Sequence, residues 1–161
     1  MNAKSLATLL KRLGACGDAV QWAKGKSLKE VWATCARGDW MLWLCGRMDG
    51  KLGWATRQEL VLAACDCAEL ALPGFEKEYP DDKRPRTAIE TARKWANGEA
   101  TREEVRTAAD AAAYAAHAAY AADAAAHAAD AAAYAAPHAA AKTNTLITCA
   151  DICRKRLYIP E

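Results

Sequence analysis

The chain has 161 residues, of which 53% are hydrophobic, and its 22 Lys and Arg nearly balance its 20 Asp and Glu. This length is sufficient for one domain with a buried core, and a net charge of +2 does not by itself indicate nucleic-acid binding. The sequence contains no charged-then-apolar leader and no long apolar span. We therefore expect a cytoplasmic protein that does not cross a membrane and keeps its seven cysteines reduced.

Apolar residues at helical spacing predict several short helices in the first part of the chain. The first should have Ser5 as its N-cap and end at Gly14, and a second should occupy residues 18–25. A capping box of Ser27 with Glu30 should open the third.

Two further helices are apolar on nearly all sides, which predicts a central place in the core. One is capped by Asp39 and contains residues 40–45. The other begins at a capping box of Thr56 with Glu59 and should stop at the Pro-Gly pair of residues 73–74.

Residues 74–84 are predicted to be a charged connection, and the helix after it should hold Pro85 in its first turn and end at Gly98. The start of that helix is a candidate anion-binding site, because a helix N-terminus exposes unpaired N–H groups. The basic residues there are Lys83, Arg84 and Arg86. The preceding aspartates, Asp81 and Asp82, leave an internal salt-bridge network as the alternative.

An alanine-rich tract, residues 108–141, contains 24 alanines among 34 residues and should form one long helix, capped by Thr101 with Glu104. Pro137 should kink or end it near Ala136. Its other side chains recur mostly every three or four residues, which leaves one face of methyl groups that could pack or pair with a second copy. The candidate partner-binding residues on the other face are Tyr114, His117, Tyr120, Asp123, His127, Asp130 and Tyr134. A solvated scaffold helix is the alternative for this face.

The sequence indicates neither catalysis nor a metal or cofactor. Cys65 and Cys67 lie about 200° apart on a helix, so they do not easily reach one ion, and the cysteines fit apolar core positions. The three histidines are ten or eleven residues apart, which is too far to share a metal. No phosphate loop, nucleophile elbow or zinc-protease motif is present.

Together these patterns predict an all-α protein, a compact bundle of about seven or eight helices that includes the long alanine-rich one. We expect a single domain over residues 1–161. Within it, residues 1–98 would form a tryptophan-rich core, residues 99–141 the long helix and residues 142–161 a C-terminal helix that begins near Thr145.

Three sequence segments resemble those of a known family. They are Arg37-Gly-Asp-Trp-Met-Leu-Trp-Leu44, Leu62-Ala-Ala-Cys-Asp-Cys-Ala-Glu-Leu-Ala-Leu-Pro73 and Arg84-Pro-Arg-Thr-Ala-Ile-Glu-Thr-Ala-Arg-Lys-Trp-Ala96, the last leading into the alanine tract. Over residues 15–157 the chain resembles the small helical immunity proteins of bacterial and phage genomes, which are associated with polymorphic toxin systems. The resemblance implies a non-enzymatic cytoplasmic protein that neutralises a protein target by binding it, and it assigns no site residues.

Three hypotheses of function follow. The first is a stoichiometric inhibitor of a protein target, either an antidote to a toxin or an anti-defence protein of a phage or mobile element, such as an anti-CRISPR. The second is a nucleic-acid-binding protein that uses the basic residues near 84–86 and 154–156. The third is an oligomerisation module that pairs through the alanine face. We favour the first.

Overall fold

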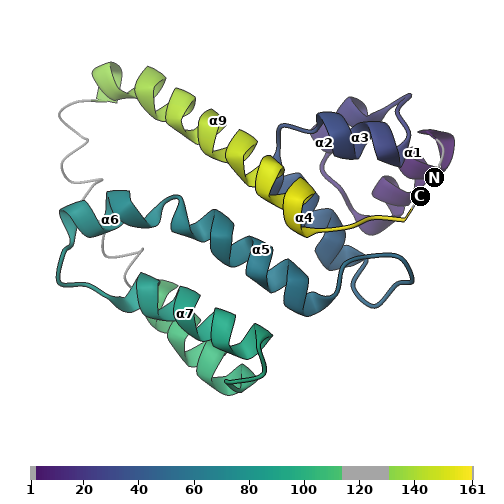
Figure 1. Ribbon diagram of the computed structural model, residues 1–161. Coiled ribbons are helices and arrows are strands. Elements are labelled where there is room, and N and C mark those ends of the chain that lie inside the picture. Colours follow the sequence, from purple (N-terminus) through teal and green to yellow (C-terminus); the bar gives the residue numbers. More distant parts are fainter. Residues whose placement is uncertain (1–2, 114–130, 161) are drawn as a thin grey trace. The chain divides into compact units, whose positions relative to one another are not determined.

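The computed structural model describes residues 3–113 and 131–160, and all regular elements in these ranges are helices (Figure 1). In chain order they are α1 (Ala3–Leu13), α2 (Gly17–Ala23), α3 (Leu28–Thr34), α4 (Gly38–Arg47), α5 (Arg57–Glu69), α6 (Leu72–Glu78), α7 (Arg84–Ala96) and α9 (Ala131–Arg156). Residues 102–113 are helical as well. The prediction of an all-α fold is confirmed.

Contacts divide the chain into two units. Unit 1 combines Met1–Ala63 with Leu146–Glu161, and unit 2 is Ala64–Thr145. Helices α5 and α9 contribute residues to both units. The predicted single domain and its subdivision at residues 98 and 141 stay predictions.

Unit 1 has an apolar core drawn from both of its chain segments. Its buried residues are Leu6, Leu10, Ala23, Leu28, Val31, Cys35, Met41, Leu44, Cys45, Trp54, Ala55, Ala63, Ala150, Cys153 and Leu157. Burial of this apolar surface, at roughly 25 cal/mol per Å², is the main stabilising contribution within the unit.

The end of α9 packs directly on the start of α4 (Figure 1). A Cβ atom added at Gly38 would lie 2.3 Å from the Cβ of Cys149 and 2.6 Å from the backbone N of Ala150. Only glycine allows this approach. One helical turn further along α9, the Cys153 thiol donates to the Gly38 carbonyl at 3.8 Å, which fixes the same crossing.

The residues that follow α9 run beside the connection between α4 and α5. Leu157 is buried, and the Ala55 N–H donates to the Tyr158 carbonyl at 3.2 Å. Gly53 has a φ of +80°, and its backbone faces the ring of Pro160. These contacts hold the end of the chain against the α4–α5 connection.

In unit 2, salt bridges connect α7 to the helices before it. The Arg93 guanidinium lies 2.6 Å from a carboxylate oxygen of Asp66 and 2.8 Å from one of Glu69, both in α5. The Arg86 guanidinium forms two hydrogen bonds of 2.6 Å with the Glu76 carboxylate in α6.

Several predicted helix boundaries are confirmed. The capping boxes at Ser27 with Glu30, Thr56 with Glu59 and Thr101 with Glu104 all form. Gly14 and Gly98, both with φ of +80°, follow α1 and α7 where helix ends were expected. Pro85 lies in the first turn of α7.

Several local predictions are wrong. Ser5 lies inside α1 and does not cap it, because the helix already begins at Ala3. Pro73 does not stop a helix but occupies the first turn of α6, where a missing N–H costs nothing, so residues 74–78 are helical. Pro137 does not end a helix at Ala136, and no separate helix begins near Thr145, because α9 is continuous from Ala131. The strong helix propensity of the surrounding alanines offsets the one hydrogen bond that proline removes.

Candidate functional site

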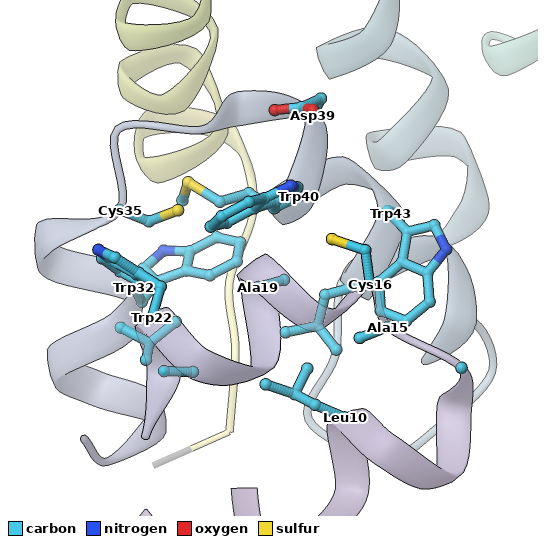
Figure 2. A pocket seen from close by; sticks show the side chains of 15 residues that line it. Leu10, Ala15, Cys16, Ala19, Trp22, Trp32, Cys35, Asp39, Trp40 and Trp43 are labelled. Carbon is cyan, nitrogen blue, oxygen red and sulfur yellow. The ribbon is translucent and has the colours of Figure 1, made fainter. Parts of the chain in front are cut away.

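An apolar pocket of about 330 Å³ lies in the described part of unit 1, between the end of α1 and helices α2, α3 and α4 (Figure 2). Four tryptophans line it: Trp22, Trp32, Trp40 and Trp43. All four are only partly buried, in contrast to Trp54 in the core. Small residues of the α1–α2 turn and of α2 leave the space open, among them Ala15 and Ala19.

The indole rings gather from three helices. Figure 2 shows Trp22 of α2, Trp32 of α3 and Trp40 of α4 close to Cys35, with Trp43 on the side of Ala15. The ring centroids of Trp22 and Trp40 are 6.1 Å apart at an interplanar angle of 57°, a favourable tilted arrangement.

Cationic side chains lie over three of the four indole rings. The Lys26 Nζ lies 3.7 Å from the centroid of the Trp22 ring and donates to the Trp22 carbonyl at 2.8 Å. The Arg37 Cζ lies 4.4 Å from the Trp40 ring, and the Arg47 Cζ lies 5.6 Å from the Trp43 ring. Such cation–π contacts hold the charged groups at the border of the pocket.

The carboxylate of Asp39 also borders the pocket, but its charge is already matched. Arg37 donates to both of its oxygens, at 2.8 and 2.6 Å. These hydrogen bonds hold the pKa of Asp39 below its usual range and raise that of Arg37. The border therefore retains the positive charges of Lys26 and Arg47.

Long-range contacts fix the connection between α3, which carries Trp32, and α4, which carries Trp40. Arg154 of α9 donates to the carbonyl of Trp32 at 2.9 Å and also to the carbonyl of Cys35. The Cys35 thiol in turn donates to the Arg37 carbonyl at 3.5 Å. Because these bonds satisfy carbonyls at the end of α3, the pocket wall is preformed.

The cysteines at the pocket differ from the expected pattern. Cys35 is buried, and burial raises the pKa of its thiol. Cys16, however, is exposed at the α1–α2 turn and lines the pocket, so the prediction that all cysteines occupy core positions is wrong there. The α1–α2 connection carries its backbone at the surface, and the apolar spacing could not distinguish it from a helix face.

Most of the predicted partner-binding residues lie outside the described residues. These are Tyr114, His117, Tyr120, Asp123, His127 and Asp130. Tyr134 lies in α9, but its side chain is not among those described.

The three predicted anion-binding residues come together at the start of α7. Lys83 and Arg84 line a shallow hollow together with Thr87, Ala108 and Ala111, whereas Arg86 is not among its lining residues. Arg84 donates to the Asp82 carboxylate at 2.9 and 2.6 Å, and Arg86 is paired with Glu76. These pairs lower the pKa of both carboxyl groups. The salt-bridge network that the sequence allowed is therefore present, and anion binding by Lys83, Arg84 and Arg86 stays a prediction.

Arg154, one of the basic residues on which the nucleic-acid hypothesis depends, is already engaged within the protein. Its guanidinium is occupied by the α3 carbonyls and by Asp151 at 2.6 Å, so it is not available to a nucleic-acid phosphate. Among the described residues, no group of three or more His, Cys, Asp or Glu is placed to hold a metal ion. No helix in this part of the chain is long and apolar enough to span a membrane.

The described residues define an all-helical protein with a preformed apolar pocket that has a basic border. The model of the family described as "Imm-5 like putative immunity protein" matches residues 50–151, and the chain belongs to this family. The suspected immunity-protein resemblance is thus confirmed. Comparisons with curated proteins and with solved structures gave no match. The residues that line the pocket, between Leu10 and Leu44, precede the matched range.

Proposed function

We propose that this protein is a non-enzymatic immunity protein that neutralises a protein target by binding it stoichiometrically in the cytoplasm. The observation that carries the proposal is membership of an immunity-protein family over residues 50–151. The target is a toxin or a defence-system effector.

The electrostatics of the described residues support a binding role over a catalytic one. Groups with perturbed pKa values mark functional sites when no structural partner explains the shift. Here the lowered pKa values of Glu30, Glu59 and Glu104 come from capping hydrogen bonds. Burial raises the pKa of Cys45 to about 12, which keeps that thiol protonated and poorly nucleophilic.

Capture from the native host tests the proposal. The tagged protein is purified from its host cells, and its partner is identified by mass spectrometry and then assayed for activity with increasing amounts of the protein. We expect activity to fall linearly and to vanish near one equivalent. Inhibition that continues at trace amounts over excess target would contradict binding as the mechanism, as would recovery of only nucleic acid or only further copies of the chain.

The identity of the captured protein separates the two classes of target. A toxin places the protein in a self-protection role, and a nuclease effector of a defence system places it in an anti-defence role. A variant with Tyr114, Tyr120 and Tyr134 changed to alanine tests whether the alanine-rich tract carries the interface, as we proposed from the sequence.

A further inference from the structure

We propose that the target binds unit 1 by inserting one large apolar side chain, carried on an acidic segment, into the tryptophan-lined pocket. This inference rests on the proposed function and adds the chemistry of the partner. It also gives a role to residues 10–44, which the family match does not cover.

The pocket has the size and lining of an anchor site. Its volume of about 330 Å³ is at the small end for ligand sites, which suits a single Leu, Phe or Trp side chain better than an extended cofactor. Binding energy in protein interfaces concentrates where such a side chain fills a desolvated pocket, and tryptophan and arginine are the residues most enriched there.

The charge around the pocket determines which sign of charge a partner should carry. Lys26 and Arg47 border the pocket on the faces of Trp22 and Trp43, and the single carboxylate among the lining residues is neutralised by Arg37. Unit 1 as a whole has 13 Lys and Arg against 7 Asp and Glu, whereas unit 2 has 9 against 13. Acidic residues beside the anchor would therefore be attracted and a basic segment repelled.

The site is already ordered before the partner arrives. Lys26 is held by the Trp22 carbonyl and ring, and Arg37 by a two-point bond to Asp39. The wall that carries Trp32 is held by Arg154. Because these side chains lose little freedom on binding, more of the interaction energy becomes affinity.

A first test uses random peptides displayed and selected against the whole chain. We expect the selected peptides to share one large apolar residue flanked by Asp and Glu. Addition of such a peptide should shift the indole N–H signals of the four pocket tryptophans in nuclear magnetic resonance spectra. The signals of Trp54 and Trp95, which do not line the pocket, should stay in place.

A matched pair of variants tests the pocket directly. Ala19 lines the pocket from α2, so Ala19→Leu should fill it and weaken binding of the selected peptide and of the captured target at least about tenfold. Ala33 is exposed on α3 and does not line the pocket, so Ala33→Leu should leave both affinities unchanged. Equal binding by the two variants would overturn the proposal.

Charge variants test the acidic partner. Arg47→Gln should weaken binding by roughly threefold at low salt, mainly through slower association, whereas Lys29→Gln on the exposed side of α3 should have a smaller effect. Selected peptides that are basic, or that lack an apolar anchor, would contradict this assignment. So would displacement of the pocket signals by a single-stranded oligothymidylate at physiological salt, because bases would then occupy the indole faces.

The two proposals fail in different ways. If the wild-type protein captures and inhibits a target that Ala19→Leu binds equally well, the inhibitor function holds and the pocket is not its interface. If no target is found but the peptide and resonance results are as expected, the pocket binds its ligand class and the inhibitor function falls.

Discussion

Units 1 and 2 are both helical, but different forces hold their described residues together. Unit 1 buries a contiguous apolar cluster, and its chain segments interlock where α9 crosses Gly38. Among the described residues of unit 2, only Cys65 and Leu72 are buried, and Arg86 and Arg93 link its helices through carboxylates near the surface.

The contrast indicates where a rigid binding surface can be built. Apolar burial provides stability that salt does not screen, whereas partly exposed ion pairs contribute about 1 kcal/mol or less and weaken with salt. Unit 1 can therefore leave four tryptophans only partly buried and still keep its fold. Five of the six tryptophans lie in unit 1, so intrinsic fluorescence reports mainly the unfolding of this unit.

The largest effect should come from Gly38→Ala. The added methyl group would overlap Cys149 and the backbone of Ala150, and we expect a loss of about 3 kcal/mol in the unfolding free energy of unit 1. Urea titration followed by tryptophan fluorescence measures this. Gly46→Ala in the same helix is the control, because its methyl group would meet only Leu60 Cδ2 at 3.6 Å and should be neutral or stabilise by up to about 1 kcal/mol. Similar curves for both variants would contradict the described crossing.

A smaller loss is expected from Arg154→Met. This change keeps the apolar stem but removes the donors to the carbonyls of Trp32 and Cys35, which should cost about 2 kcal/mol. It should also broaden or shift the indole signal of Trp32. Lys155→Ala, at the exposed neighbouring position, should leave stability within about 0.5 kcal/mol of wild type. An unchanged Trp32 signal in the Arg154 variant would show that this arginine does not hold the pocket wall in place.

In unit 2, Arg93→Met should remove about 1 kcal/mol at low salt and much less at high salt, because the lost contacts are ion pairs with Asp66 and Glu69. Amide hydrogen exchange along α7 measures the local effect. Lys94→Met serves as control, since Lys94 is the exposed neighbour. Exchange that rises equally at both salt concentrations would indicate that packing, and not charge, holds α7.

The smallest effect concerns the cap of α3. Hydrogen bonds from Ser27, first of all from its backbone N–H, lower the pKa of Glu30 below 4.5. A lowered folded-state pKa means that the carboxylate stabilises the helix above pH 4.5 and that this contribution disappears as the pH falls through the folded value. The Ser27 amide resonance should titrate with a midpoint below 4.5, and Glu30→Gln should abolish that transition. A midpoint at or above 4.5 would be inconsistent with the capping box.

The sequence correctly predicted helix caps and turns that depend on residues close together in the chain. A capping box such as Thr56 with Glu59 is a contact across three positions, and the turn after α7 at Gly98 needs only a positive φ. Pro73 shows the limit of such local reasoning, since the same residue can end one helix or begin another.

The packing of α9 and the pocket could not be predicted, because both depend on contacts between segments that are distant in the sequence. The packing of α9 on Gly38 brings together residues that are more than a hundred positions apart in the sequence. The hydrogen bond from Arg154 to the Trp32 carbonyl spans a similar sequence separation. Helical periodicity places the tryptophans on the apolar faces of their helices, but it does not specify how much of each ring a neighbouring helix covers. The pocket was therefore missed, although six tryptophans with a single phenylalanine were a compositional signal for it.

The order in which the two chain segments of unit 1 are synthesised affects how this unit folds during translation. Helices α1 to α4 leave the ribosome first, and then all of Ala64–Thr145 is synthesised before Leu146–Glu161 can return to them. Until Cys149 and Cys153 emerge, the backbone at Gly38 lacks the apolar residues that cover it. Until Arg154 emerges, the carbonyl groups at the end of α3 lack their hydrogen-bond donor. We therefore expect the nascent chain to expose this apolar surface until synthesis is nearly finished, and the wall formed by the tryptophans to become rigid only after α9 has packed.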